Sequence, residues 1–344
     1  MKKLAWLVAA VMLLTCLTAC RNTQSGSELE KAFTTTNVNG GVKITAYTGN
    51  YTSLEIPSTI KGKRVVAIGD DVFASQYLLT EIVIPDTVTE IGAHAFQGCR
   101  ALESITIPDS VTTIGDYAFF GCWAAKTLHI GSGLSSMGRQ AIQYCKSLET
   151  ITVSEDNSKY AATDEGILFT ADYSTLLCYP SAAPMTSYTV PKNCTAIADY
   201  AFRNCVNLTS VTIGSHVKEL GDSAFYACTA LKSVTIEEGG LEFLGLSLFE
   251  DCTALEEIVI PEGVKTLGYL LEDGECGKTF EGCTALKKVV FPASLTNVYA
   301  NVFDQCTSLK EVAFRGTESA WKSIMIGQGN TPLTEAAVTY DYQG

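Results

Sequence analysis

The chain has 344 residues, with 37 acidic and 24 basic side chains and a formal net charge of −13. This charge argues against nucleic-acid binding, because neutralising a row of phosphates requires clustered lysine and arginine. It favours solubility and partners that are basic. The length alone suggests two domains, but the repeats described below predict one continuous architecture.

The N-terminus has the charge and hydropathy pattern of an export signal. Lys2 and Lys3 form a positive start, residues 4–14 are apolar but too few to span a bilayer, and Leu17-Thr18-Ala19-Cys20 follows. The last motif is similar to a lipobox, which implies cleavage before Cys20 and attachment of lipid to its thiol. Loss of Lys2 and Lys3 would take the net charge from −13 to −15. The alternative is a plain secretory signal cleaved near Ala19.

We therefore predict a lipoprotein signal peptide over residues 1–19 and lipid attachment at Cys20. Residues 20–32, which contain Ser, Gly, Gln and Asn, predict a flexible tether. Several acyl chains bury enough apolar groups to hold a protein stably on a membrane. The predicted localisation is extracytoplasmic, on the cell surface, with the membrane contacted through the N-terminal lipid only.

Most of the chain repeats one unit, which residues 95–115 show clearly. The unit is Ala-Phe-x-x-Cys-x-x-Leu-x-x-Ile-x-Ile-Pro-x-x-Val-x-x-Ile-Gly. Its first aromatic or aliphatic position recurs at Phe73, Phe96, Phe119, Ile142, Phe202, Phe225, Phe249, Phe280 and Phe303. The step is 23 residues, apart from single steps of 60, 24 and 31. Such a period predicts stacked units, each too small to bury its own apolar face.

Each unit predicts one coil of a solenoid. Ile105 and Ile107 alternate as the inward residues of a strand, which Pro108 ends because it has no N–H. Val-x-x-Ile-Gly is a second short extended piece, and its glycine, such as Gly115, is expected to supply a positive φ. The Ala-Phe-x-x-Cys-x-x-Leu spacing predicts a turn or two of helix or 3₁₀-helix. The expected fold class is an α/β repeat, with a stacked parallel sheet on one face and short helical turns on the return.

This unit resembles the BspA-like class of bacterial leucine-rich repeats from about residue 41 to the end. Its two blocks, Ala-Phe-x-x-Cys-x-x-Leu and Ile-Pro-x-x-Val-x-x-Ile-Gly, recur together, and the first stands at residues 118–122 and 201–205. The resemblance implies a leucine-rich-repeat solenoid on the cell surface or secreted. It also implies adhesion as one function, since some members bind host proteins or other cells. It carries no catalytic residues over to this chain.

The breaks in the period predict caps and inserts. Residues 33–69 are expected to form an N-terminal cap with the first strand unit, 70–313 the solenoid, and 314–344 a C-terminal cap plugged by Trp321. The long step predicts a β-hairpin insert at about 154–189, for packing or for ligand binding. The step of 31 predicts a small acidic insert at about 269–277. Its Glu272-Asp273-Gly274-Glu275 is a solvated turn or, alternatively, a calcium site.

Cysteines form a ladder at one position of the unit. Of the 13, Cys16 leaves with the signal and Cys20 is assigned to lipid. Eight share a position, namely Cys99, Cys122, Cys145, Cys205, Cys228, Cys252, Cys283 and Cys306. Equivalent neighbours on both sides give no preferred disulfide partner, so buried reduced thiols are predicted. Cys178, Cys194 and Cys276 lie off the ladder, and Cys276 could close a small loop with Cys283. The absence of Cys-x-x-Cys argues against zinc.

The sequence predicts no catalytic residues, cofactor or metal. His94, His129 and His216 stand at different positions of different units, and adjacent carboxylates such as Glu256 and Glu257 point apart on an extended chain. A phosphate-binding glycine loop, a Gly-x-Ser-x-Gly elbow and a His-Glu-x-x-His helix are absent from the sequence. We therefore expect a protein without enzymatic activity.

Short hydroxyl side chains are expected to cover the outer face of the parallel sheet. The candidate binding residues are Ser104, Thr106, Thr127, His129, Thr150, Thr152, Ser210, Thr212, Ser233 and Thr235. Strand propensity alone can explain them. They would also make a flat platform whose groups both donate and accept hydrogen bonds at little entropic cost. This face lacks aromatic residues that stack on sugars, which favours protein ligands.

The predicted function is a non-catalytic protein-binding or adhesion module for host or bacterial surface proteins. One alternative is a surface carbohydrate-binding protein whose ligands are glycans. Another is a structural envelope component without a specific ligand.

Overall fold

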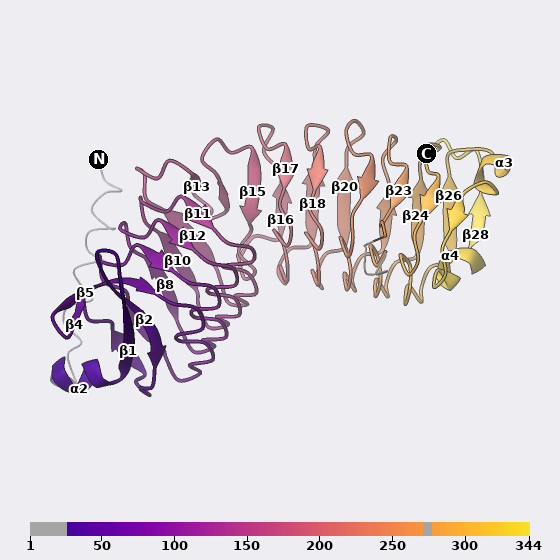
Figure 1. Cartoon of the computed structure of the whole chain (residues 1–344). Helices are drawn as coiled ribbons and strands as arrows, with labels where there is room; N and C mark the ends of the chain where they lie inside the picture. The colour runs from indigo at the N-terminus through magenta and orange to yellow at the C-terminus, as the bar shows by residue number, and fades with distance from the viewer. Residues whose placement is uncertain (1–25, 271–276) are drawn as a thin grey trace.

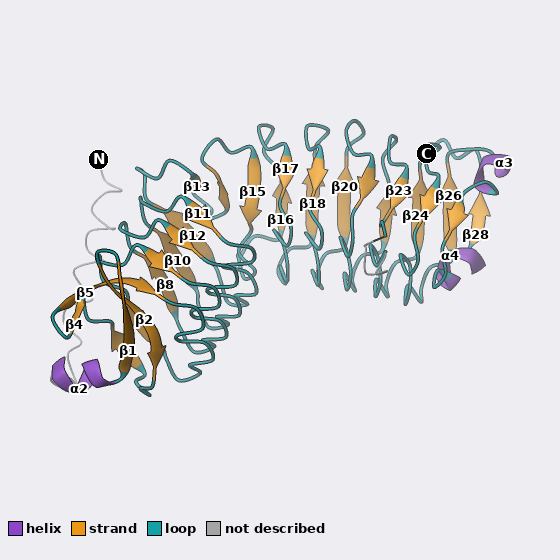
Figure 2. Ribbon diagram, in the orientation of Figure 1, coloured by secondary structure: helices purple, strands orange, loops and turns teal. Residues whose placement is uncertain are grey.

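The computed structural model describes residues 26–270 and 277–344, which form an elongated solenoid (Figure 1). The signal peptide, Cys20 and residues 21–25 of the tether fall outside the described residues, as do Glu272-Asp273-Gly274-Glu275 and Cys276 of the expected acidic insert. Residues 26–31 of the expected flexible tether form a short helix. Figure 2 shows strands along both sides of the solenoid, turns between them and helices only near the two ends.

The Leu-x-x-Ile-x-Ile segments form one side, which we call the broad face. Its strands pair in parallel within three groups. The first two groups are β3 (Ser53–Glu55) and β6 (Glu81–Val83), then β8 (Ser104–Ile107), β10 (Thr127–Ile130) and β12 (Thr150–Val153). The third is β16 (Ser187–Thr189), β18 (Ser210–Ile213), β20 (Ser233–Ile236), β22 (Glu257–Val259), β24 (Lys288–Phe291), β26 (Glu311–Phe314) and β28 (Ala337–Thr339).

The Val-x-x-Ile-Gly segments form shorter strands on the opposite side, the narrow face. They are β5 (Lys63–Ile68), β7 (Glu90–Ile91), β9 (Thr113–Ile114), β11 (Ser136–Met137), β15 (Thr175–Cys178), β17 (Ala196–Ile197), β19 (Glu219–Leu220), β21 (Phe243–Leu244), β23 (Thr266–Leu267), β25 (Asn297–Val298) and β27 (Met325–Ile326). Within three groups, β5 to β11, β15 to β19 and β21 to β27, neighbouring strands pair in parallel, as Glu90 does with Thr113. The predicted second extended piece is therefore confirmed.

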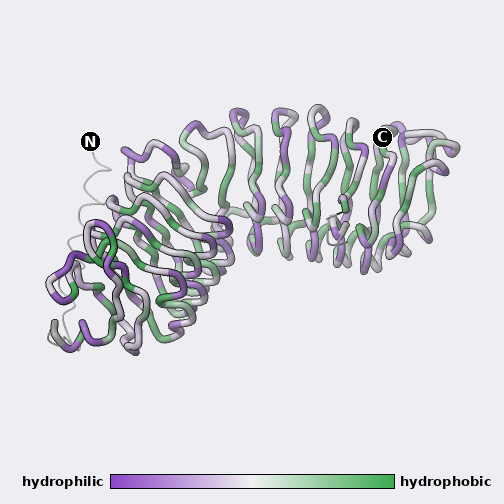
Figure 3. Tube along the Cα trace, viewed as in Figure 1, coloured by the Kyte–Doolittle hydropathy of each residue, from purple (hydrophilic) through white to green (hydrophobic). Residues whose placement is uncertain are grey.

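Alternating burial and ring stacking fill the space between the two faces. Ile105 and Ile107 are buried while Ser104 and Thr106 are exposed, as period-two alternation predicts. In Figure 3 the hydrophobic colour lies mainly along the strands and the hydrophilic colour mainly at the turns between them. The recurring phenylalanine rings stack from coil to coil, with centroids 5.0 Å apart for Phe73 and Phe96 and 4.9 Å apart for Phe96 and Phe119.

The return segments are hydrogen-bonded turns rather than the short helices expected from their spacing. The Phe96 N–H donates to the Ala118 carbonyl of the next coil at 2.7 Å, so it is not available for a helical bond. Left-handed residues flank the phenylalanine, here His94 with φ 56° and Gly98 with φ 70°. These two reversals fold the segment back and leave its peptide groups facing the neighbouring coil.

The glycine of each Ile-Gly pair is needed for close approach, and the expectation of a positive φ there is wrong. Among the recurring glycines of the described chain, Gly268 alone has a positive φ, of 70°. A Cβ on Gly115 would lie 2.7 Å from the Gly92 carbonyl carbon and 2.8 Å from Ala93 Cα. The backbone of one coil thus passes directly over the next at Gly115, where glycine leaves room that a methyl group would fill.

The stretch expected to be an insert contains a further coil. Tyr179 takes the place of the recurring phenylalanine, and its ring stacks on Phe202 at 5.0 Å. The strand β16 follows it and pairs in parallel with β18, and Pro191 ends this coil's broad-face strand. The long step of 60 residues is therefore one coil of 37 residues followed by one of 23.

The additional residues form the expected hairpin at the end of the longer coil. After β13 (Tyr160–Ala162), β14 (Leu168–Thr170) pairs antiparallel with β15. Asp172 closes the turn, because its Oδ1 accepts from Thr170 Oγ1 at 2.7 Å and from the Ser174 N–H at 3.0 Å. The strand β15 then joins the narrow face beside β17.

The hairpin is the seam between two hydrophobic clusters. Leu168 and Cys178 pack in the N-terminal cluster, whereas Ile167, Phe169 and Leu176 pack in the C-terminal one. Neither face is paired continuously across this point, since β11 and β12 each end a sheet. Figure 1 shows the coils on either side running in different directions, so the solenoid is a bent rod.

Caps cover both ends. At the N-terminus α2 (Gly26–Lys31) precedes an antiparallel hairpin of β1 (Phe33–Val38) and β2 (Gly41–Tyr47), and β4 (Thr59–Ile60) flanks β5. At the C-terminus lie α3 (Glu318–Trp321) and α4 (Thr331–Glu335). The Trp321 ring packs 5.3 Å from that of Phe314, as expected of a plug over the last coil.

Candidate binding surface

The predicted hydroxyl stripe exists on the broad face, and its N-terminal part is held in register by three strands. Thr127 lies opposite Ser104 on one side and Thr150 on the other. In the parallel row His129 lies between Thr106 and Thr152, and its Nδ1 is 3.0 Å from Thr152 Oγ1. We call these residues the N-terminal panel: Ser104, Thr106, Thr127, His129, Thr150 and Thr152.

The C-terminal part begins one coil earlier than predicted. Ser210 pairs with Ser233, and Thr212 with Thr235. Ser187 and Thr189 of β16 continue the two rows, and sequence reasoning missed them because the coil lacks the phenylalanine and cysteine of the unit. Pro191, twelve residues after Tyr179, was the available signal. The C-terminal panel is Ser187, Thr189, Ser210, Thr212, Ser233 and Thr235.

The structure does not bring the ten predicted residues into one sheet. The N-terminal panel belongs to the sheet β8, β10 and β12, while the C-terminal panel belongs to the sheet that starts at β16. The seam and the bend lie between the two. The predicted platform is therefore two hydroxyl panels that face different directions.

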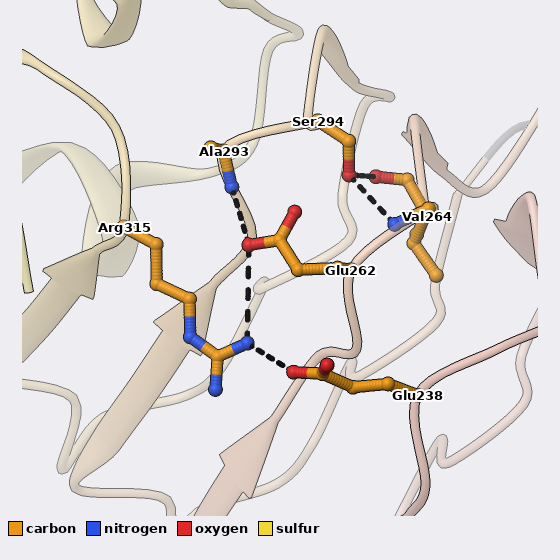
Figure 4. A network of polar contacts seen from close by, with 7 residues as sticks. Glu238, Glu262, Val264, Ala293, Ser294 and Arg315 are labelled. Carbon is orange, nitrogen blue, oxygen red and sulfur yellow. Dashed lines mark hydrogen bonds and ion pairs between the residues drawn. The ribbon is translucent and has the colours of Figure 1, made fainter. Parts of the chain in front are cut away.

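Charge replaces hydroxyls beyond the C-terminal panel. Lys288 Nζ lies 3.1 Å from Glu257 Oε1, across two adjacent strands. Figure 4 shows Arg315 reaching from the last coils to two acids, with Nη1 2.8 Å from Glu238 Oε1 and 3.8 Å from Glu262 Oε1. Glu262 Oε1 also accepts the Ala293 N–H at 3.0 Å. This network joins several coils at one corner and leaves the broad face there without a free hydroxyl row.

The cysteine ladder is buried and reduced, as expected, but each thiol has a polar role that the sequence did not reveal. All ten described cysteines are free and buried. Cys228 Sγ donates to the Phe202 carbonyl of the preceding coil at 3.0 Å, and Cys99 does the same to Phe73 at 3.1 Å. Burial raises the pKa of Cys99 and of Cys306 to about 12. Protonated thiols of this kind donate weakly and react little.

The clefts of the solenoid contain carboxylates that accept hydrogen bonds from backbone N–H groups. One cleft of about 250 Å³ lies at the seam, and a wider one of about 840 Å³ runs along β17, β19 and β21. Both are lined by Asp199, whose pKa is raised by burial. Its Oδ1 accepts the Asp222 N–H at 2.9 Å, and Asp222 Oδ1 accepts the Leu246 N–H at 2.9 Å. The carboxylates therefore cap successive corners.

The three histidines stay apart in the fold. His94 stacks on Tyr117 at a turn, His129 lies in the N-terminal panel, and His216 occupies a corner loop. Within the described residues no group of histidine, cysteine, aspartate or glutamate side chains is arranged to hold a metal ion. In the same part of the chain every helix is too short or too polar to span a bilayer.

The fold recurs in solved bacterial proteins. A leucine-rich cell surface protein from Faecalibacterium prausnitzii is 26% identical, with a TM-score of 0.58 over 89% of this chain and 98% of that one. A leucine-rich repeat protein from Eubacterium ventriosum is 20% identical, with a TM-score of 0.61 over 89% and 92%. The pneumococcal vaccine antigen PcpA is 16% identical, with a TM-score of 0.56 over 91% and 100%. A search of curated proteins gives no match.

The family model for the BspA type leucine rich repeat region matches in six copies, over residues 66–163, 177–271 and 276–325. The first gap, 164–176, coincides with the hairpin of the seam, and the match resumes just before Tyr179. The matched residues make up most of the chain and include the coil that lacks the typical phenylalanine. The chain belongs to the BspA-type leucine-rich-repeat family.

Proposed function

We propose that the protein is a lipid-anchored, extracytoplasmic adhesion module that binds another surface protein through its broad face, without catalysis. The two hydroxyl panels in strand register carry this proposal. Their side chains donate and accept hydrogen bonds, lose little entropy when fixed and stand on a rigid sheet. The cell-surface description of the related Faecalibacterium prausnitzii protein supports an extracytoplasmic location.

The sheet-face proposal is tested by capture of partners from host and bacterial surface-protein extracts, identified by mass spectrometry, beside a glycan array. Replacing Thr127, Thr150, Ser210 and Ser233 by Arg is expected to abolish capture, because long cations displace a flat partner. Arg at Thr113 and Ser136 is the matched control, since both are exposed strand residues of the narrow face. Capture that survives the broad-face changes, or that fails equally in the control, would remove this face as the site.

The lipid anchor is tested separately. Cys20→Ala is expected to move the protein from the membrane fraction to the soluble extracytoplasmic fraction, because the thiol is the proposed acylation site. Metabolic labelling with an alkyne fatty acid should mark the wild type and not the variant. A Cys20→Ala protein that stays on the membrane would exclude the anchor.

A further inference from the structure

Aromatic rings and cationic side chains alternate in a column along the N-terminal coils. The column lies on the return segments, outside the broad face. Tyr77, Arg100, Trp123 and Lys146 each follow the inward Phe or Ile of their coil by four residues. Arg100 Cζ lies 5.3 Å from the Tyr77 ring centre and 3.9 Å from that of Trp123. Lys146 Nζ, from the next coil, lies 4.5 Å from the Trp123 ring. The side chains therefore stack in the order ring, cation, ring, cation.

The column continues across the seam. Lys146 Nζ is also 5.0 Å from the Tyr144 ring, and Arg203 Cζ reaches the same ring at 5.0 Å from beyond the hairpin. Arg203 is then 4.9 Å from the ring of Tyr226. We call these residues the aromatic–cation stripe: Tyr77, Arg100, Trp123, Tyr144, Lys146 and Arg203.

The cations of the stripe have no acidic partner. Most ion-paired cations of the described chain face a carboxylate of a neighbouring coil, as Lys287 does with Glu256 at 2.7 Å. Within the described residues Arg100, Lys146 and Arg203 form no ion pair, although acids outnumber bases 37 to 24 in the whole sequence. Arg203 Nε is buried without a hydrogen-bond partner. Three positive charges without an ion-pair partner on one edge of an acidic protein favour an anionic ligand.

Stacking prepares these cations for binding. A guanidinium held against an aromatic face keeps its planar N–H groups free at the edge, where they match the geometry of a carboxylate. Arg100 and Lys146 are exposed, and Tyr77 keeps 54% of its surface accessible. The entropic cost of fixing two long side chains is therefore partly met before a ligand arrives.

The spacing of the cations selects an extended, regular ligand. Counting the coil of Tyr179, Arg100, Lys146 and Arg203 belong to every second coil. Arg100 Cζ and Lys146 Nζ are at most 8.4 Å apart across the Trp123 ring, and Lys146 Nζ and Arg203 Cζ are at most 10.0 Å apart across the Tyr144 ring. Linear polysaccharides in which an acidic sugar alternates with a neutral one carry carboxylates at comparable intervals. An acidic peptide would have to hold an extended form with its carboxylates on one side, which costs more ordering entropy.

We propose that the aromatic–cation stripe binds a linear acidic polysaccharide, with carboxylates on Arg100, Lys146 and Arg203 and the neutral sugars against the edges of the intervening rings. The site ends near Tyr226, because Glu250 and Asp251 follow on the next coil and their charges act on the Tyr226 hydroxyl. Those carboxylates repel a polyanion. This site is distinct from the hydroxyl panels and independent of a protein partner there.

The test uses hyaluronan as the probe, immobilised on a sensor, with neutral dextran and poly-glutamate as comparison surfaces and the purified full chain as the analyte. The chain is expected to bind hyaluronan, to ignore dextran and to bind poly-glutamate more weakly. Arg100→Gln and Lys146→Gln should each weaken binding about tenfold, since each removes a charge-assisted contact. Lys287→Gln removes an equal charge from an exposed, ion-paired lysine and should leave binding unchanged.

Added salt should weaken hyaluronan binding by the wild type more steeply than by Arg100→Gln, because fewer charges are screened in the variant. Thermal unfolding of each variant establishes that it is folded. Absence of hyaluronan binding, equal loss in Lys287→Gln, or stronger binding to poly-glutamate would overturn the proposal. The arginine variants of the broad face should retain hyaluronan binding, so loss of partner capture and loss of hyaluronan binding can be told apart.

Discussion

At the scale of single residues, the recurring glycine shows how a solenoid constrains its backbone. The sequence indicates a special position at Gly115, but two physical reasons compete there, a positive φ and a close approach of chains. The structure selects the second, because a side chain would press on the backbone at Gly92 and Ala93. The left-handed positions lie elsewhere, at residues such as His94 and Tyr117 that carry full side chains.

Gly115→Ala is therefore expected to destabilise the protein by about 3 kcal/mol, because backbone atoms must move to admit the methyl group. Gly62→Ala is the matched control, since Gly62 has φ 74° and open space around its Cα. Its expected cost is about 1 kcal/mol, for the strained dihedral alone. Urea unfolding monitored by circular dichroism measures both. A larger loss in Gly62→Ala would contradict the close-approach argument.

Because the thiols are buried, the free energy of unfolding is expected to fall at alkaline pH. The ordinary thiol pKa of 9.0 is raised to about 12 in Cys99 and in Cys306. In the unfolded chain these groups lose their protons near pH 9 while the folded chain keeps them, so stability is full below pH 9 and falls as pH rises towards 12. Urea midpoints measured across this interval should fall, and Cys99→Ala should make the fall shallower. An unchanged slope would show that Cys99 does not contribute.

Because the thiols are buried, we also expect them not to react with alkylating reagents in the folded protein. Iodoacetamide at neutral pH should label none of the ten described thiols in the folded protein and all of them in urea, because only exposed thiolates react. Intact mass with and without reductant provides the count. Labelling that requires reductant even in urea would reveal disulfides and contradict the free ladder.

At the scale of elements, the coil from Tyr179 to Ala201 shows where sequence reasoning reached its limit. The repeats, the two strands of each coil, both caps and the hairpin were predictable, because period and alternation record which side chains face inward. The coil of Tyr179 was not, since its core positions are filled by residues of different type, including Tyr188 and Cys194. Packing requires a bulky apolar group there, and it does not require phenylalanine or cysteine.

Of the candidate surfaces, the hydroxyl rows could be predicted from the sequence, whereas the aromatic–cation stripe could not. The hydroxyl rows followed from strand alternation, but their separation at the seam depends on how β12 and β16 fail to pair. The aromatic–cation stripe joins Tyr144 to Arg203, which are far apart in sequence and stand at different positions of the unit. Such contacts arise from the hairpin and could not be read from the period.

Tyr179 gives a test of the substituted coil. Its ring is buried against Phe202, but its hydroxyl is buried without a hydrogen-bond partner. Tyr179→Phe is therefore expected to leave stability unchanged or raise it by about 1 kcal/mol, because an unsatisfied polar group is removed. Tyr179→Ala should cost about 3–5 kcal/mol through the cavity it leaves. Urea midpoints distinguish the two, and a clear loss in Tyr179→Phe would show that the hydroxyl is satisfied in solution.

At the scale of the whole molecule, the hairpin couples two hydrophobic clusters that could otherwise unfold separately. Repeat arrays are stabilised by contacts between neighbours, so a weak interface divides them into independent blocks. Phe169 is fully buried on the C-terminal side of the seam, while Leu168 beside it packs on the N-terminal side. These two adjacent side chains therefore link the two blocks, because each is buried in a different cluster.

Phe169→Ala is expected to split urea unfolding into two transitions, with hydrogen exchange placing the boundary between residues 33–153 and 179–344. The reason is that the seam loses a large, fully buried side chain from the C-terminal cluster. Phe119→Ala, in the interior of the N-terminal cluster, is the matched control and should not place the boundary at the seam. A single transition in Phe169→Ala would show that the halves are coupled by other contacts.

The bend has a geometric consequence for how many neighbours the molecule can hold. A straight rod presents its whole length to the same rigid body, whereas two inclined surfaces have different normals, and a flat object can rest flush on only one of them. In the proposed mode of binding, occupation of the N-terminal panel therefore leaves the C-terminal panel open, so that a single molecule would bridge two separate bodies. A partner that touches both at once must itself be angled to the same degree.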